Sequence, residues 1–317
     1  MAAGGLTLSQ PLLRPESPPA GRSRLVDIPV GHSVSSEAPF KMRNSLVGHP
    51  LFQPARIRRL LRTLPREAVE IRGVKTIDDG SYMRGPLLAD ADPVDTFDRL
   101  HERTAWMLLH HTWRHDGDYA SLLREYARDV AETFAGAGSD LSDLGCWIFL
   151  SSGRCVVHFH ADPDQSVLNQ IQGSKTVYVY PCRSLPETAV ENLIYTGDQG
   201  AVVYDQRYEA AMFPPTRLGP GESVFLPFVA PHRVINDDGV SISINIGFQT
   251  RQSRRRSDVH LVNLELRRLG LQPARFGARP WMDELKARAF LAFRAKNHFF
   301  PSLRPPVPDR ESEPLRR

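Results

Sequence analysis

Apolar residues recur at helical spacing in three stretches of the first half of the chain. Over residues 54–64 they fall at i, i+3, i+4 and i+7 and form one stripe, made of Ile57, Leu60, Leu61 and Leu64. Pro54 suits a first helical turn, and Pro65 ends the predicted helix. The same spacing predicts helices over residues 93–113 and 118–136.

From about residue 144 the period changes to short strand-like runs. Gly, Pro and Asp separate these runs, which cover residues 146–150, 155–160, 176–180, 223–226 and 240–246. Several short strands in succession predict a β-sandwich or a β-barrel. Beyond residue 250 the pattern becomes helical again, around residues 259–269 and 280–297.

This pattern divides the chain into five parts. Residues 1–38 lack periodicity and are rich in Pro, Gly and Ser, which predicts a flexible arm. A mostly helical region, residues 39–143, is expected to pack on a barrel formed by residues 144–250. Helices over residues 251–300 and a flexible, Pro- and charge-rich tail over residues 301–317 complete the predicted organisation.

Composition places the 317-residue chain among ordinary globular proteins, with 41% hydrophobic and 24% charged residues. No apolar run approaches the roughly 18–20 residues that a membrane helix needs, so we expect no membrane span. The first residues lack the basic segment that precedes the apolar part of a secretory signal. The three cysteines have no CxxC spacing and fit reduced thiols, which favours a cytoplasmic protein.

The formal net charge of +4 raises the question of a nucleic-acid partner. The basic residues, however, gather in short segments, residues 56–62, residues 251–256 and the terminal Arg316-Arg317. A solvated surface explains such segments as well as nucleic-acid binding does, so we do not expect a nucleic-acid partner.

The residues that indicate chemistry are His160 and Asp162, at the end of one strand-like run. Residues i and i+2 of a strand share a face and lie about 6.5–7 Å apart along the chain, so an imidazole and a carboxylate can meet at one metal ion. His232, which follows a later run, is the candidate third ligand. Two histidines and one carboxylate form the facial triad of non-haem Fe(II) oxygenases, which leaves positions for a co-substrate and O₂.

Two further polar residues accompany this triad. Lys175 lies 15 residues after His160, at the start of the next strand-like run. A partly buried ammonium at that place can pair with the distal carboxylate of a diacid that chelates the iron. Asn245 lies on a late strand and can direct an amide into the same cavity.

The stretch HADPDQSVLNQIQGSKT, which begins at His160, resembles part of the JmjC-type, cupin-like Fe(II)/2-oxoglutarate-dependent oxygenases. Pro231-His232 and the strand with Asn245 fit the same pattern, and the similarity covers about residues 144–250. The nearest subgroup is the one that contains the asparaginyl hydroxylase inhibiting hypoxia-inducible factor. The resemblance implies a mainly β fold with flanking helices, built on a double-stranded β-helix (a jelly-roll or cupin barrel).

The resemblance also implies roles for individual residues. His160, Asp162 and His232 would be the iron ligands of the catalytic centre, Lys175 would bind the C5 carboxylate of 2-oxoglutarate, and Asn245 would lie near that co-substrate. The implied reaction consumes O₂, releases succinate and CO₂, and hydroxylates a C–H bond of a protein, peptide or small-molecule substrate. Similar proteins further imply a homodimer formed through the C-terminal helices.

Two departures from the family pattern keep other functions open. Val157 stands where members often place a hydroxyl that helps to hold 2-oxoglutarate, and Ser166 stands where many have Asn. These changes favour a second hypothesis, a non-catalytic cupin-like binding or regulatory protein. A third hypothesis is a metal-dependent small-molecule enzyme, such as an isomerase, with His158, His160 and His232 as ligands.

Overall fold

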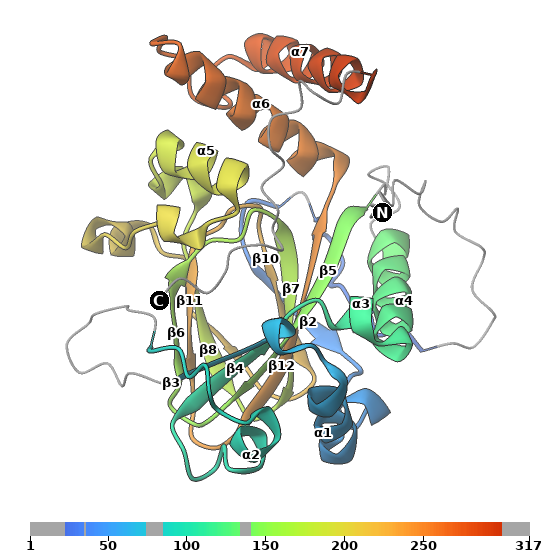
Figure 1. Cartoon of the computed structure of the whole chain (residues 1–317). Helices are drawn as coiled ribbons and strands as arrows, with labels where there is room; N and C mark the ends of the chain where they lie inside the picture. Colours follow the sequence, from blue (N-terminus) through green and yellow to red (C-terminus); the bar gives the residue numbers. More distant parts are fainter. Residues whose placement is uncertain (1–22, 35, 74–84, 134–140, 300–317) are drawn as a thin grey trace, which may run out of the picture.

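The computed structural model describes residues 23–34, 36–73, 85–133 and 141–299. Within these residues, antiparallel strands form an eight-stranded sheet with the order β1-β2-β10-β7-β12-β5-β4-β3 and a four-stranded sheet with the order β6-β11-β8-β9 (Figure 1). The strands of residues 141–250 are β5 (Ser142–Ser151), β6 (Val156–His160), β7 (Gln165–Gln172), β8 (Lys175–Val179), β9 (Thr216–Leu218), β10 (Glu222–Leu226), β11 (His232–Asn236) and β12 (Ser241–Gln249).

These last eight strands form a double-stranded β-helix. Strands β5, β12, β7 and β10 make one wall, and β6, β11, β8 and β9 make the wall that faces it. The chain passes from one sheet to the other at each step from β5 to β8, and again from β9 to β12. This is the winding of a jelly roll, so the predicted fold class is confirmed.

Four strands from the N-terminal region extend the larger sheet at both sides of the barrel. Strands β1 (Val26–Asp27) and β2 (Phe40–Asn44) continue it beyond β10, because β2 pairs with β10. Strands β3 (Val69–Gly73) and β4 (Ala105–Leu109) continue it beyond β5, because β4 pairs with β5. The barrel wall therefore has N-terminal strands at both of its edges.

The main hydrophobic core lies between the larger sheet and the helices that cover its outer face. These helices are α1 (Pro54–Thr63), α2 (Pro93–Asp98), α3 (Thr112–His115) and α4 (Gly117–Thr133), with the short 3-10 turns η1 (Pro50–Phe52) and η2 (Arg66–Ala68). The apolar stripe of α1 packs in one cluster with Ile148 and Ile244 of the sheet. Tyr126 of α4 is fully buried and donates a hydrogen bond of 2.8 Å to Asn169 Oδ1 on β7.

An insert between β8 and β9 packs against one end of the smaller sheet. It contains η3 (Cys182–Ser184), α5 (Glu187–Thr196), η4 (Gln199–Ala201) and η5 (Gln206–Ala211). Its residue Leu193 packs in a second apolar cluster with Phe159 of β6 and Tyr180, which directly follows β8. Helix α6 (Arg251–Arg268) then packs on both α5 and α7 (Pro280–Phe299), so these helices project from one end of the barrel (Figure 1).

The predicted single helix over residues 93–113 is wrong. Helix α2 ends at Asp98, and β4 occupies residues 105–109. Every residue of β4 is buried, because Met107 faces the core beneath the helices while Trp106 faces the barrel interior. A strand that is covered on both faces loses its alternating pattern, and its apolar run then resembles part of a buried helix.

The predicted flexible arm over residues 1–38 is wrong for its last part. Leu25, Val26 and Ile28 are buried in the main core. The Leu25 backbone N–H also donates a hydrogen bond of 2.6 Å to the Asp129 carboxylate of α4. Residues 1–22 and the predicted tail over residues 301–317 lie outside the described residues.

The helices of the described ranges include no segment whose length and apolar character would allow it to cross a membrane.

Candidate metal centre

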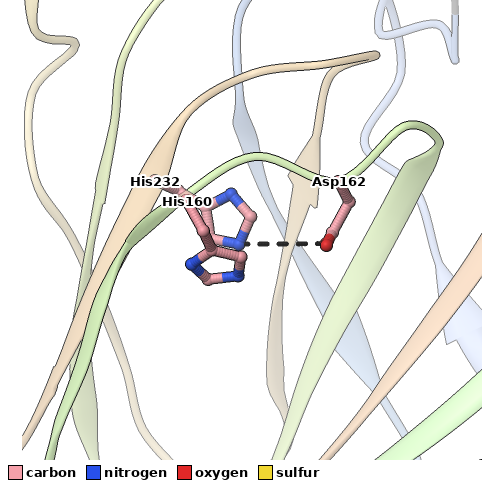
Figure 2. A group of neighbouring side chains, drawn as sticks. All are labelled: His160, Asp162 and His232. Carbon is pink, nitrogen blue, oxygen red and sulfur yellow. Dashed lines mark ion pairs between the residues drawn. The ribbon is translucent and has the colours of Figure 1, made fainter. Parts of the chain in front are cut away.

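His160, Asp162 and His232 come together on the inner side of the barrel. His160 ends β6, Asp162 follows two residues later, and His232 begins β11 directly opposite His160 in the strand register. One ligand atom from each residue lies within 4.8 Å of the other two. The Asp162 Oδ2 atom is 4.0 Å from His232 Nε2 (Figure 2), and the two imidazole centroids are 4.2 Å apart.

Backbone carbonyls fix the orientation of both imidazoles. His160 Nδ1 lies 2.8 Å from the carbonyl oxygen of His158, and His232 Nδ1 lies 3.0 Å from that of Ala230. A carbonyl oxygen only accepts hydrogen bonds, so Nδ1 is the donor in each contact, and in the neutral ring Nε2 is then the nitrogen available to a metal. Metal-ligating histidines are oriented in the same way, with one nitrogen on the metal and the other donating to an acceptor.

A register shift in the β6–β11 pair places the ligands on the inner face. His232 pairs with His160, but Val234 pairs with Val157 rather than with His158. In a regular strand, side chains alternate between the two faces, so Val157 and His160, three residues apart, would point to opposite faces of β6. The irregularity allows both side chains to face the barrel interior. Bulges of this kind redirect side chains and are common beside active sites.

The residues beside the first two ligands point away from the site. Phe159 and Ala161 are buried in the apolar cluster beneath the insert, which fixes that face of the segment. Alternation along the strand then directs His160 and Asp162 toward the other face. The residues that alternate with the HxD ligands therefore also matter, because burial of Phe159 and Ala161 fixes the orientation of the segment.

Lys175 lies deep inside the barrel and is 3% exposed. Its Nζ donates a hydrogen bond of 2.9 Å to Ser243 Oγ, and no carboxylate of the described residues forms an ion pair with it. Burial lowers the pKa of Lys175 to about 8, and the nearby Cys155 opposes this shift. At pH 7 the amine is therefore a largely protonated cation inside the protein, and a buried cation is costly unless an anion compensates it.

Asn245 lies on β12, the strand that also carries Ser243, the hydrogen-bond partner of Lys175. It is two residues from Ser243 on the same face, and it is 7% exposed. Within the described part of the chain its Oδ1 has no hydrogen-bond partner, and neither has the buried Oγ of Ser166, which lies opposite Gly247 on the neighbouring strand. Buried polar atoms of this kind indicate a water or a ligand that completes their hydrogen bonds.

Val157 and Ser166, the two residues that depart from the family pattern, both lie on the inside of the barrel. Val157 packs among apolar residues of the barrel interior, beside Val234, and supplies no hydrogen bond there. Ser166 keeps a hydroxyl on the inner wall, although its side chain is shorter than that of Asn. The polar contacts available at this end of the barrel are therefore fewer than the family pattern provides.

Trp147 forms part of the inner wall near the same end. A Cβ added at Gly145 or at Gly247 would lie 2.8 Å from its ring, so the indole covers both glycines. The His111 ring lies 5.7 Å from the Trp147 ring, measured between centroids.

One contact to the triad has no counterpart in the sequence pattern. Gln199 of η4 donates its Nε2 to Asp162 Oδ1 over 2.7 Å. The two residues are 37 positions apart, and no motif surrounds Gln199. The one sequence signal for this contact is that the insert contains polar residues, which could contact the site.

His158 belongs to neither of the two potential metal-binding groups in the described part of the chain. The arrangement of His158, His160 and His232 considered for an isomerase is therefore not the one that the side chains form. The ring of His158 instead lies beside that of His160, with centroids 5.1 Å apart.

The second group consists of Glu187, Glu191 and His260, at the contact of α5 with α6. Arg267 Nε donates to both oxygens of Glu191, at 2.9 and 3.1 Å, and Arg275 donates to Glu187 at 3.3 Å. Guanidinium groups thus already neutralise both carboxylates. We interpret the group as an ion-pair network that joins α5 to the C-terminal helices.

Comparison with known proteins finds no matching family model and no matching curated protein. Among solved structures, the chain is similar to YcfD, a ribosomal oxygenase from Escherichia coli. For the complex with cobalt and succinic acid the identity is 17% and the TM-score 0.43, over 81% of this chain and 62% of that chain. For the complex with cobalt and 2-oxoglutarate the values are 18% and 0.42, over 83% and 65%.

A more distant similarity is to DddQ, a DMSP lyase from Ruegeria pomeroyi DSS-3. Here the identity is 19% and the TM-score 0.23, over 35% of this chain and 41% of that chain. The chain spans less than two thirds of the length of the YcfD chains. At these identities and scores, the comparisons extend no further than a likeness of fold.

Proposed function

We propose that the protein is an Fe(II)- and 2-oxoglutarate-dependent oxygenase that hydroxylates a C–H bond of its substrate. The observation that carries this proposal is the arrangement inside one barrel of two imidazoles, one carboxylate and a buried amine. His160, Asp162 and His232 would hold the iron, and Lys175 would bind the C5 carboxylate of 2-oxoglutarate. When bound, iron supplies the activation of O₂ that converts 2-oxoglutarate to succinate and CO₂ and oxidises the substrate.

The donor set fits Fe(II). Imidazole and carboxylate ligands suit iron, and three protein ligands leave coordination positions for a bidentate 2-oxo acid and for O₂. The two Nδ1–H···O=C contacts present Nε2 of both histidines as lone-pair donors, which supports their role as ligands.

The surroundings of Lys175 fit a dicarboxylate. A carboxylate beside Lys175 Nζ would compensate the charge of an amine whose one acceptor among the described residues is the Ser243 hydroxyl. The unsatisfied Oδ1 of Asn245 and Oγ of Ser166 lie along the same wall and can complete the polar contacts. The site therefore has a cation at one end and a metal-ligand set at the other, which matches a molecule with a carboxylate and a chelating 2-oxo acid.

The substrate class that we propose to assay first is a protein or peptide side chain. This choice rests on the sequence resemblance to the subgroup of the asparaginyl hydroxylase that inhibits hypoxia-inducible factor. Small molecules are the second class, and we propose no nucleic-acid or membrane partner.

Anaerobic titration of the Fe(II)-loaded protein with 2-oxoglutarate tests the proposal. Chelation by the 2-oxo acid should produce a metal-to-ligand charge-transfer band. In Lys175→Ala the band should require much more 2-oxoglutarate, because the distal carboxylate loses its cation. In Lys286→Ala, which removes another buried lysine far from the site on α7, the titration should match wild type. An unchanged titration of Lys175→Ala would remove the assigned role of this lysine.

Val157 favours one alternative, a cupin-like binding or regulatory protein without turnover, because an apolar side chain stands where a hydroxyl would help to hold the co-substrate. The two functions differ in one product. An oxygenase should form succinate from 2-oxoglutarate in the presence of Fe(II) and O₂, even slowly and without its substrate. Metal binding without 2-oxoglutarate affinity and without succinate would instead support the alternative.

We also propose that the protein forms a homodimer through its C-terminal helices. Trp281 and Leu285, one turn apart on α7, are 68% and 62% exposed, and Leu269 before α7 is 77% exposed. Large apolar side chains gathered on projecting helices are typical of an interface. A symmetric pairing of this surface with a second copy would cover it.

A further inference from the structure

A side chain from outside the barrel contacts the candidate iron site. Gln199 Nε2 donates to Asp162 Oδ1 over 2.7 Å, and Gln199 belongs to the insert that follows β8. The amide is half-buried, so it is neither a core residue nor a freely solvated one. The contact therefore needs an explanation in terms of Asp162.

The backbone around Gln199 is held by a set of local hydrogen bonds. Helix α5 ends at Thr196 and is capped by Gly197, which adopts φ of 71° and donates its N–H to the carbonyl oxygen of Leu193. The Asp198 N–H donates to Thr196 Oγ1 at 3.0 Å, and Asp198 Oδ1 accepts from the N–H of Gly200 at 2.7 Å. Gln199 thus extends toward Asp162 from a defined turn.

The same turn is anchored to the strand that carries His160. Leu193 before the turn and Val202 after it are buried in the cluster that contains Phe159 and Ala161. These last two residues flank the first ligand, so the insert and the ligand segment share one apolar contact. The distance from Gln199 to Asp162 is therefore set by packing as well as by the hydrogen bond.

The hydrogen bond makes the two oxygens of Asp162 different. Oδ1 is engaged by the Gln199 amide, while Oδ2 lies 4.0 Å from His232 Nε2, on the side of the other ligands (Figure 2). The Asp162 side chain follows the end of β6 and is 24% exposed, so β-sheet packing alone does not fix its rotation.

We propose that Gln199 is a positioning residue that holds Asp162 with Oδ2 directed at the metal. The inference rests on the proposed function, because it assigns Asp162 as a ligand. It adds that a residue of the insert, outside the barrel, sets the geometry of the metal site. Contacts of this kind to a ligand typically change metal affinity by 10–100-fold when they are removed.

The first experiment compares wild type, Gln199→Leu and Gln206→Leu. Gln206 is an exposed residue of the same insert, so its variant is a matched control with the same chemical change. Titration with Co²⁺ is followed by the visible spectrum, and titration with Ni²⁺ is followed by calorimetry. We expect Gln199→Leu to bind both metals about 10–100-fold more weakly and to alter the Co²⁺ bands. Gln206→Leu should behave as wild type, and the metal-free variants should melt at the same temperature.

The second experiment repeats the Ni²⁺ titration in an Asp162→Ala background, where the two histidines remain and Ni²⁺ binds imidazole well. If Gln199 acts through Asp162, adding Gln199→Leu to this background should change the affinity less than twofold. An equal loss in both backgrounds would mean that Gln199 only supports the fold of the insert, which overturns the inference.

The outcomes separate the two proposals. If wild type binds metal and Gln199→Leu binds it equally well with the same spectrum, the positioning role is wrong while the proposed function stands. If wild type binds neither Co²⁺ nor Ni²⁺, both proposals are wrong.

Discussion

If the protein binds 2-oxoglutarate at Lys175 as proposed, burial of this lysine should make the binding depend on pH. Its pKa is lowered to about 8 by burial, so in the protein without co-substrate the amine loses its proton between about pH 7 and 9. A distal carboxylate binds the protonated amine, and the apparent Kd of 2-oxoglutarate should therefore rise about tenfold from pH 7 to pH 9. Anaerobic charge-transfer titrations at pH 7, 8 and 9 measure this change.

Two controls isolate the amine in this prediction. Pyruvate chelates through the same 2-oxo acid group but has no distal carboxylate, so its affinity should not follow the titration of Lys175. Lys175→Arg stays charged throughout this range, which should make the Kd of 2-oxoglutarate nearly constant with pH. An unchanged wild-type Kd between pH 7 and 9 would contradict the pairing.

The lowered pKa of Lys175 also makes the free energy of unfolding depend on pH, and this quantity should rise with pH whereas the affinity for 2-oxoglutarate should fall. Between about pH 8 and 10.5 the unfolded chain still holds the proton of Lys175, whereas the folded chain has released it. The unfolded state then binds more protons, so the contribution of this residue to the free energy of unfolding rises with pH in that window.

The residues of the candidate site differ in how far the sequence predicts them. His160 and Asp162 are two positions apart, and Lys175 and His232 follow in the order of a known family, so local spacing and resemblance together indicate them. The structure brings the three metal-ligand candidates together. Gln199 could not be predicted, because its contact depends on how the insert folds back over β6, and no local pattern encodes that path.

At the scale of elements, the turn between β7 and β8 depends on Gly173. This residue has φ of +72°, and a Cβ at its position would lie 2.6 Å from the backbone carbonyl oxygen of Val240. Gly239 is a matched control, because it has φ of +86° but no atom within 4 Å of an added Cβ.

The two alanine variants should therefore differ in stability. Gly239→Ala should cost about 1 kcal/mol from backbone strain alone, and Gly173→Ala should cost roughly 1–3 kcal/mol more, because the added methyl group also displaces backbone. Chemical denaturation of both variants measures the difference. Equal losses would show that the close approach to Val240 is relieved without cost.

Two of the strands that the sequence pattern does not predict, β7 and β11, bury polar residues. Strand β7 buries Ser166, Asn169 and Gln170, so its sequence does not read as an apolar run. Strand β11 begins with a histidine and ends with Asn236, which is also buried. By contrast, α1 and α4 were predicted because one face is apolar and the other meets water. Ser166 of β7 and His232 of β11 lie at the candidate site, whereas Asn169 bonds Tyr126 of α4 on the other face of the sheet.

For the whole molecule, metal and co-substrate should stabilise the fold by mass action. A ligand that binds only the folded state at a hundred times its Kd adds about 2.7 kcal/mol to the free energy of unfolding. Thermal denaturation with Co²⁺ and 2-oxoglutarate should therefore give a higher Tm than denaturation with EDTA. His232→Ala should lose this increase, whereas His101→Ala, on the surface, should keep it. A wild-type Tm that does not change with either ligand would contradict the site.

The proposed homodimer is also a property of the whole molecule. Sedimentation should give a particle of about twice 35.6 kDa for wild type. The double variant Trp281→Ser, Leu285→Ser should dissociate, because it removes the apolar surface of α7. Val203→Ser, which changes a 73% exposed apolar residue on the insert, should remain dimeric. A wild-type particle of the single-chain mass would show that the exposed α7 surface has another role.

The pairing of β2 with β10 and of β4 with β5 has a consequence for any attempt to isolate the barrel that carries the candidate site. A chain shortened to residues 144–250 would carry two rows of unbonded peptide groups, one on each side of the same wall, together with the apolar face that α1 and α4 now shield. Such a fragment would recruit further copies of itself edge to edge and precipitate. The smallest unit that folds on its own therefore begins well before the first ligand, near the strand at Val26.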